Sequence, residues 1–158
     1  MNYSDLVTRL NQRQLTISCA ESLTGGQFQS HLTQEPAAGN VYVGGFITYA
    51  TAAKHRLLDI PEPIITQYGV VSHQAAWQMA QRAKVIAQTD IGISFTGVAG
   101  PDRLEDKPVG TVYIGLVTPT CGHSQAFQFD GDSSQIVHQT CQAGIALLLD
   151  FLAINQRL

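Results

Sequence analysis

Residues 20–26 of this chain are Ala-Glu-Ser-Leu-Thr-Gly-Gly, and they predict a turn from a strand into a helix. The apolar run over 15–19 predicts the strand, and the segment over 25–33 predicts the helix. A hydroxyl residue at such a turn lies beside backbone N–H groups that have no partner inside the helix. Those donors can bind a phosphate or a carboxylate, or stabilise the oxyanion that forms when a nucleophile attacks a carbonyl. The stretch therefore indicates an α/β unit with a ligand-binding or catalytic turn.

The two glycines of this turn narrow the kind of ligand only slightly. Gly25 and Gly26 have no β-carbon, so the backbone can approach a ligand closely there. Their spacing is neither Gly-x-Gly-x-x-Gly nor that of a P-loop, so a dinucleotide fingerprint is missing. A glycine turn that only opens a helix is the plain alternative. The function must therefore be argued from the residues that accompany the turn.

The composition indicates a domain with a well-buried core rather than a disordered or membrane chain. Of 158 residues, 44% are apolar and 13% are charged, and we expect residues 1–158 to form a single domain. A formal charge of −3 gives no electrostatic reason to expect nucleic acid or an anionic membrane as a partner. No charged start leads into an apolar signal region, and no apolar run approaches about 18 residues. We therefore expect a cytoplasmic protein.

Cysteines and histidines show no metal-binding spacing. The three cysteines are an odd number without a Cys-x-x-Cys pair, and the five histidines lack His-x-x-x-His spacing. We expect neither a disulfide framework nor a metal site.

Helices alternate with strands early in the chain, and a hairpin follows. Helices are predicted over 4–13, 25–33, 51–58, 73–88 and 133–153, with Ser4 and Ser72 as N-caps. Strands are predicted over 15–19, 41–49, 91–96, 109–117 and 123–129. We expect strand 41–49 to be buried, and the prolines of 60–63 to interrupt the pattern. This order predicts an α/β fold, a three-layer α/β/α sandwich with a mixed, mostly parallel sheet.

Polar side chains follow three of the predicted strands at their carboxyl ends, where open α/β sheets bind ligands. The three sets are Ser22 with Thr24, Thr48 and Tyr49 with Lys54 shortly after them, and Thr96 just before Gly97. Parallel strands would bring these sets to one pocket.

A serine hydroxyl at neutral pH needs a base before it can act as a nucleophile. No histidine lies in the strand-end segments, so a Ser-His-Asp triad has no support. Lys54 is the candidate base if burial lowers its pKa from about 10.4 toward neutrality, and Tyr49 would then relay the proton or orient the ammonium. A solvated Lys54 and a Tyr49 in the core are the plain alternatives.

Three other polar features each have two interpretations. Glu21 either holds a substrate amine or hydroxyl, or completes the N-terminal cap of the following helix. Thr96 is either a ligand contact or a plain strand residue. The charged segment 102–108 is either a solvated loop or a segment that closes partly over a ligand.

Five motifs occur in an order and spacing that resemble the CinA C-terminal domain family, the nicotinamide mononucleotide deamidases. They are Ala20 to Gly26, Gly44-Gly45-Phe46-Ile47-Thr48-Tyr49 with Lys54, Gly69-Val70-Val71-Ser72, Thr96-Gly97-Val98-Ala99-Gly100-Pro101, and Lys107-Pro108-Val109-Gly110-Thr111-Val112-Tyr113. The resemblance runs from about residue 5 to about residue 152. The chain is similar to the freestanding short form, without the amino-terminal domain of full-length CinA proteins.

The resemblance implies hydrolysis of nicotinamide mononucleotide to nicotinic acid mononucleotide and ammonia, without a metal or organic cofactor. It implies Ser22 as the nucleophile and Lys54 as the general base, with Tyr49 and Thr96 completing the catalytic network. Backbone N–H groups near Thr24 and Gly25 are candidates for the oxyanion hole. The candidate substrate-binding residues are Glu21, Thr24, Gly25, Gly26, Thr48, Gly97, Ala99, Gly100 and Arg103. The expected partners are the mononucleotide substrate and further copies of the chain, because compact α/β enzymes often form symmetric oligomers.

Three segments depart from the family's usual pattern. Gly131-Asp132-Ser133 and Ile136-Val137 stand where Gly-Asp-Arg and Ile-Arg are usual, Asp102-Arg103-Leu104 replaces a glycine-rich loop, and Ala50-Thr51 replaces Ser-Asn. Loss of an arginine–phosphate contact weakens binding by on the order of 1.5–3 kcal/mol, and Arg103 is the candidate substitute. The alternative function is therefore a weak or inactive relative that binds a nucleotide-like ligand or a protein partner. An NAD(P)-dependent reductase is disfavoured, because its glycine fingerprint is missing.

Overall fold

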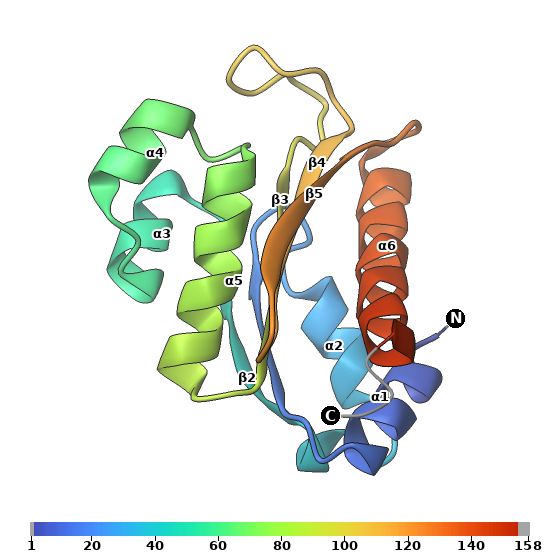
Figure 1. The fold of residues 1–158 in the computed structure, drawn as a ribbon. Helices are drawn as coiled ribbons and strands as arrows, with labels where there is room; N and C mark the ends of the chain where they lie inside the picture. The colour runs from blue at the N-terminus through green and yellow to red at the C-terminus, as the bar shows by residue number, and fades with distance from the viewer. Residues whose placement is uncertain (1, 155–158) are drawn as a thin grey trace.

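The computed structural model describes residues 2–154 of the 158-residue chain. Three layers are visible in Figure 1, with a twisted sheet between two groups of helices. The helices are α1 (Tyr3–Gln12), α2 (Gln27–Thr33), α3 (Thr51–Leu58), α4 (Glu62–Tyr68), α5 (His73–Ala87) and α6 (Ser133–Ile154), with a short 3-10 turn over Ala38–Asn40. The strands are β1 (Ile17–Glu21), β2 (Tyr42–Ile47), β3 (Ile91–Gly97), β4 (Thr111–Val117) and β5 (Gly122–Gln128).

The sheet has the strand order β2-β1-β3-β4-β5. Strand β1 pairs in parallel with both β2 and β3, whereas β4 runs antiparallel to β3 and to β5. Strand β4 is thus the one strand of the five that points the opposite way. This confirms the predicted α/β/α sandwich with a mixed, mostly parallel sheet.

Helices α1, α2 and α6 cover one face of the sheet, and α3, α4 and α5 lie over the other (Figure 1). The larger apolar core lies under α1, α2 and α6, where the rings of Phe28 and Phe95 pack at a tilt of 43° with centroids 4.8 Å apart. The smaller core includes Ala20 of β1 and Met79 of α5. Because both faces of β1 are covered, all five of its residues are buried.

Two predicted helix starts have different outcomes. Ser72 caps α5 as predicted, and its side chain accepts the N–H of Ala75. The prediction that Ser4 caps the first helix is wrong, because Asn2 accepts the N–H of Asp5 at 2.8 Å and Ser4 lies inside the helix. Either residue type suits an N-cap, so the type alone could not choose between them.

Two strand predictions also need correction. The first strand spans Ile17–Glu21 rather than 15–19, so Ser22 is the first residue past its end. Strand β2 is not buried, because it forms an edge of the sheet and leaves Val43 57% and Ile47 49% exposed. An apolar run indicates a strand, but it does not say whether the strand has two neighbours or one.

The prediction that the prolines of 60–63 interrupt the pattern is wrong, because helix α4 begins there. Pro61 is its N-cap and Pro63 lies in its first turn, where a fixed φ suits a helix and the missing N–H costs no bond.

Helix α6 has the length and apolarity of a membrane-spanning helix. An 18-residue stretch of it has a mean hydropathy of 1.4, although no such apolar run is expected from the sequence, and 56% of that stretch is buried inside the fold. Core helices of globular domains share these properties, so we treat α6 as part of the larger core.

Candidate active site

The carboxyl ends of β1 and β2 bring a lysine to a serine. The N–H of Thr48, just past β2, donates to the carbonyl of Glu21 at 2.8 Å and fixes the two strand ends side by side. Helix α3 begins three residues later and carries Lys54 back over the turn after β1. The Nζ of Lys54 lies 3.2 Å from the Oγ of Ser22 and donates to the carbonyl of Thr48 at 2.7 Å. The predicted convergence of these two strand ends is therefore present.

Lys54 is only 1% exposed, so the alternative of a solvated lysine is wrong. Burial lowers the pKa of Lys54 from 10.5 to about 8, and the nearby charge of Glu105 acts in the opposite direction. With a pKa of about 8, roughly a tenth of the amine is neutral at pH 7. The carbonyl of Thr48 orients the amine, so a neutral Lys54 can present its lone pair to Ser22. This is the geometry that a general base requires.

Glu21 serves the helix rather than an open pocket. Its carboxylate is fully buried and accepts the N–H groups of Gly26 at 3.0 Å, Phe28 at 3.2 Å and Gln29 at 2.9 Å. This is the capping interpretation of Glu21, and it leaves the carboxylate behind the turn, out of solvent. The buried Glu21 carboxylate thus stabilises the turn that carries Ser22.

The N–H groups of the turn are divided between internal bonds and free donors. The Gly25 N–H donates to the carbonyl of Ser22 at 3.1 Å, so its assignment to an oxyanion hole needs correction. Over residues 2–154, no hydrogen bond is formed by the N–H groups of Leu23 and Thr24. These two donors, next to the Ser22 hydroxyl, are the available candidates. Gly25 contributes open space instead, because a β-carbon there would meet no atom within 4 Å.

Two buried threonine hydroxyls beside the pair have no hydrogen-bond partner among the described residues. They belong to Thr24, which is 1% exposed, and to Thr48, which is fully buried. A buried hydroxyl without a partner is uncommon in native proteins and calls for a ligand or a water. Thr24 and Thr48 are therefore the predicted substrate contacts that the geometry favours most.

The remaining predicted residues take different places. Tyr49 is 73% exposed, so a position in the core is wrong, and the structure describes no hydrogen bond from it to Ser22 or Lys54. Thr96 is buried and donates to the carbonyl of Val70 at 2.6 Å. Arg103 is exposed and donates to the carbonyl of Asp106 at 2.6 Å, within its own loop. Neither Tyr49 nor Thr96 touches the Ser22–Lys54 pair through a hydrogen bond here.

The predicted glycines near the site have packing roles. A β-carbon on Gly26 would lie 2.8 Å from the side chain of Ile47, and one on Gly97 would press on the backbone of β4. Gly100, at φ 86°, packs against Val109, and Ala99 is half-buried beside it. Close packing against the chain itself, rather than approach to a ligand, explains Gly26, Gly97 and Gly100.

A residue near the site whose contacts the sequence did not predict is Glu105. Its segment is charged and allows two interpretations from sequence, a solvated loop or a partial cover, yet its carboxylate accepts the N–H of Val70 at 2.7 Å and of Val71 at 3.0 Å. Residues 35 positions apart in the chain form this contact, so no local pattern could have revealed it. The motif Gly69-Val70-Val71-Ser72 offered the one available signal, because its glycine lies directly against this carboxylate.

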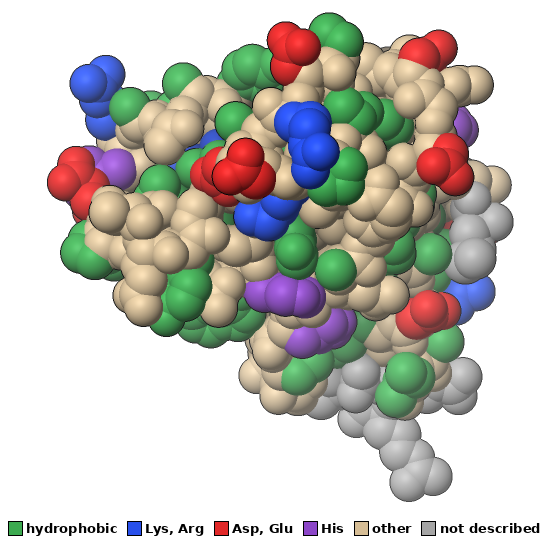
Figure 2. All heavy atoms as spheres, turned by 90° about the horizontal axis from the view of Figure 1, so that it is seen from above, with side chains coloured by type: hydrophobic (Ala, Val, Ile, Leu, Met, Phe, Trp, Pro, Cys, Tyr) green, Lys and Arg blue, Asp and Glu red, His purple; other side chains and the backbone are tan. Residues whose placement is uncertain are grey.

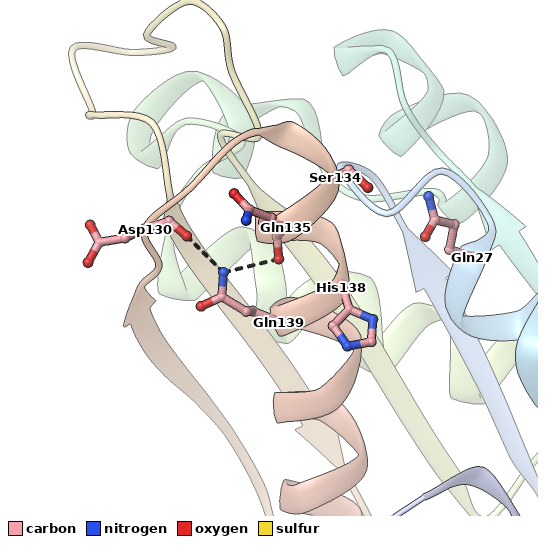
Figure 3. Close-up of a pocket in the computed structure, with 6 residues that line it drawn as sticks. All are labelled: Gln27, Asp130, Ser134, Gln135, His138 and Gln139. Atoms are coloured by element: carbon pink, nitrogen blue, oxygen red, sulfur yellow. Dashed lines mark hydrogen bonds between the residues drawn. The ribbon is translucent and has the colours of Figure 1, made fainter.

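A cavity of about 510 Å³ opens between the starts of α2 and α6. It is lined by Gln27, Asp130, Ser134, Gln135, His138 and Gln139, and Figure 3 shows Gln27 facing α6 across it. Gln139 donates to the carbonyls of Asp130 and Gln135, so part of the wall is fixed. None of the six lining residues is a lysine or an arginine. Among residues 2–154, no cluster of histidine, cysteine and acidic side chains is placed to hold a metal.

The fold and the site define an α/β sandwich domain with a buried serine–lysine pair at the carboxyl edge of its sheet. A sequence model of the CinA C-terminal domain matches residues 2–152. The chain belongs to the CinA C-terminal domain family, which confirms the resemblance inferred from its motifs.

Relatives and solved structures agree with this membership. A protein of Geobacillus sp. (strain WCH70), provisionally named competence-damage inducible protein, is 42% identical over 152 residues, covering 96% of this chain and 36% of that protein. The chain thus spans about a third of the length of the curated relatives it matches. The crystal structure of a competence-damaged protein (CinA) superfamily protein from Escherichia coli is similar with a TM-score of 0.92 at 31% identity, covering 94% of this chain and 87% of that one. A CinA superfamily protein from Klebsiella pneumoniae gives a TM-score of 0.91 at 29% identity, covering 97% and 99% of the two chains.

Proposed function

We propose that this domain is an amidohydrolase that converts nicotinamide mononucleotide to nicotinic acid mononucleotide and ammonia. The observation that carries the proposal is the buried Nζ of Lys54, 3.2 Å from the Oγ of Ser22. An amine in this position, with its pKa lowered to about 8, is suited to take a hydroxyl proton near neutral pH. Membership of the CinA family is compatible with this activity.

The reaction would proceed in two half-reactions. Neutral Lys54 takes the proton from Ser22 as its oxygen attacks the carboxamide carbon, and the N–H groups of Leu23 and Thr24 stabilise the oxyanion. The ammonium of Lys54 then gives its proton to the leaving nitrogen, so that ammonia departs and an ester forms on Ser22. Water, deprotonated by Lys54, attacks that ester and releases the acid together with the free serine.

The phosphate end of the substrate would lie in the cavity between α2 and α6. The cavity adjoins Gln27, the first residue of α2, and Ser133 and Ser134 open α6 beside it. Hydroxyl and amide groups can bind a phosphate, but without the paired, charge-assisted bonds of an arginine. We therefore expect affinity for the mononucleotide to be roughly ten- to a hundredfold below that of a site with an arginine. Tyr49, with its ring in solvent, is proposed as a rim contact to the substrate.

The test is ammonia release from nicotinamide mononucleotide, nicotinamide riboside and nicotinamide by the purified protein. We expect turnover of the mononucleotide, with the riboside slower. Ser133→Arg should lower the KM for the mononucleotide and leave that for the riboside unchanged, because only the first carries a phosphate. A protein that releases no ammonia from any of the three would contradict the proposal.

The second candidate is a relative that binds a mononucleotide without turnover. It is favoured by the cavity wall, which carries Asp130 and no basic lysine or arginine among its six residues. Binding in calorimetry with no product at high enzyme concentration would support it.

Four further expectations concern the domain organisation, location, oligomeric state and partners of the protein. A single domain over 1–158, a cytoplasmic location, a homo-oligomer and the absence of a nucleic-acid partner stay predictions. Figure 2 shows acidic, basic and histidine side chains interspersed on the face that it draws. Light scattering of the purified protein measures the oligomer directly.

A further inference from the structure

The segment 102–108 ends in a tight turn that has an unfavourable backbone conformation. Glu105 has φ 53° and Asp106 φ 60°, and the N–H of Lys107 donates to the carbonyl of Leu104 at 2.9 Å. Residues other than glycine seldom adopt positive φ, and they keep it where surrounding contacts enforce it. The turn is therefore held in place by something other than local preference.

The contact that holds it is the carboxylate of Glu105. One oxygen accepts the N–H of Val70 at 2.7 Å and the other accepts the N–H of Val71 at 3.0 Å. The side chain of Glu105 is 29% exposed, and Lys107 lies 3.7 Å from it. A β-carbon at Gly69 would overlap this carboxylate, and φ 77° at Gly69 also disfavours any other residue.

The same peptide unit connects Glu105 with β3. The peptide between Val70 and Val71 is bound at its N–H by Glu105, and its carbonyl accepts the hydroxyl of Thr96 at 2.6 Å. Segment 102–108 is thus fastened to the carboxyl edge of the sheet, where the Ser22–Lys54 pair lies.

The negative charge of Glu105 also acts on the pKa of Lys54, in the direction opposite to burial. Of the described ionisable groups, Glu105 is the one whose charge acts on the amine, and it favours the protonated form. Two cations belong to the same segment: Lys107 lies 3.7 Å from the Glu105 carboxylate, and Arg103 donates to the carbonyl of Asp106. On α3 itself, His55 contacts the carbonyl of Ile60 through Nδ1, and Arg56 is exposed.

We propose that Glu105 is a positioning residue of the Ser22–Lys54 site, which latches segment 102–108 to the Val70–Val71 peptide at the carboxyl edge of the sheet. Its consequence for catalysis rests on the proposed amidohydrolase function, but the latch and the charge do not. Opposite charges favour the ionised form of an amine, so removal of this carboxylate makes Lys54 easier to deprotonate.

The test is the titration of Lys54 by NMR in protein labelled at lysine Cε and Nζ. The chain has three lysines, Lys54, Lys84 and Lys107, so Lys54→Met assigns the signal. Glu105→Gln should lower the pKa of Lys54 by about half a unit or more, and Asp102→Asn, which removes an exposed charge of the same segment, should leave it unchanged. An unchanged Lys54 titration in Glu105→Gln would overturn the proposal.

A second variant tests the latch with the charge retained. Gly69→Ala should displace the carboxylate and shift Lys54 in the same direction, whereas Gly39→Ala, where an added β-carbon meets nothing within 4 Å, should not. If Glu105→Gln does not fold, an unchanged titration in folded Gly69→Ala overturns the proposal instead.

The titration needs no substrate, so it separates the latch from the proposed function. If Glu105→Gln shifts the Lys54 titration but the protein releases no ammonia, the proposed role of Glu105 stands and the proposed amidohydrolase function is wrong. In an active protein, the acid limb of kcat/KM should move to lower pH in Glu105→Gln together with the titration, which loss of structure alone would not produce.

Discussion

The side chains of Ser22 and Lys54 meet at 3.2 Å although they lie 32 residues apart in the chain. The contact depends on two parallel strands, because β1 and β2 end side by side and each is followed by a helix that begins at the same edge. Serine supplies the oxygen from the turn after β1, and lysine supplies the nitrogen from one turn inside α3. The pairing of β1 with β2 thus places the two proposed catalytic groups, the serine hydroxyl and the lysine amine, side by side.

The pH dependence of activity should follow the protonation of Lys54. Its pKa is lowered to about 8 by burial, and only the neutral amine can accept a proton. We expect kcat/KM to fall about tenfold per pH unit below pH 8 and to level off above it. A pH–rate profile from pH 5.5 to 10 measures this, and a flat profile between pH 6 and 8 would be incompatible with Lys54 as the base.

The free energy of unfolding should also depend on the protonation of Lys54. Its change with pH should have the opposite sign from that of a surface lysine whose pKa is raised by an acidic partner. Because the pKa of Lys54 is lower in the folded than in the unfolded chain, the unfolded state binds more protons between pH 8 and 10.5. The free energy of unfolding of the wild type should therefore rise with pH in this window relative to Lys54→Met, by up to about 1.4 kcal/mol per unit. Denaturant unfolding at pH 7, 8, 9 and 10 measures it, with Lys84→Met as the charge control. Parallel curves for wild type and Lys54→Met would count against a buried, weakly basic amine.

The hydroxyl of Thr96 should matter for activity beyond its contribution to folding. Thr96→Val removes its bond to the carbonyl of Val70, and Thr140→Val removes a comparable buried bond to the carbonyl of Ile136 on α6. Each should lower the free energy of unfolding by about 1–3 kcal/mol. Only Thr96→Val should also lower kcat/KM, by about tenfold, because it loosens the peptide that holds segment 102–108. Equal kcat/KM for the two variants would remove Thr96 from the site.

Glu21 should act through the turn that it caps. Glu21→Gln retains one acceptor oxygen where the carboxylate accepts three N–H groups, and it leaves at least one donor unpaired. We expect the free energy of unfolding to fall by about 2–4 kcal/mol, since bonds to a buried charge are strong. Glu62→Gln, in the exposed first turn of α4, should be nearly neutral. Thermal unfolding compares the two, and a loss confined to Glu62→Gln would contradict the capping role.

Local sequence signals predicted the parts of the fold that depend on neighbouring residues. Helix α3 begins and ends where its pattern placed it, and Ser72 caps α5, because both follow from residues within one or two turns. The pairing of Ser22 with Lys54 was also predictable, because parallel strands place their carboxyl ends at one edge.

The predictions that were wrong or missing concern features that depend on tertiary structure rather than on neighbouring residues. The exposure of β2 follows from its edge position, which a run of apolar residues does not encode. Likewise, the docking of Glu105 on Val70 joins residues 35 apart, and the capture of the Gly25 N–H by Ser22 depends on the final shape of the turn. Sequence patterns therefore predicted that Ser22 and Lys54 meet, but not how the donors and acceptors around them are shared.

The rate of ammonia release from nicotinamide mononucleotide by Ser22→Ala, compared with wild type at pH 8.5, tests the central claim most directly. Removing the nucleophile should lower kcat by at least about a thousandfold in a variant whose circular dichroism and unfolding transition match the wild type. A folded Ser22→Ala protein that releases ammonia as fast as the wild type would contradict the claim that the serine–lysine pair carries the chemistry.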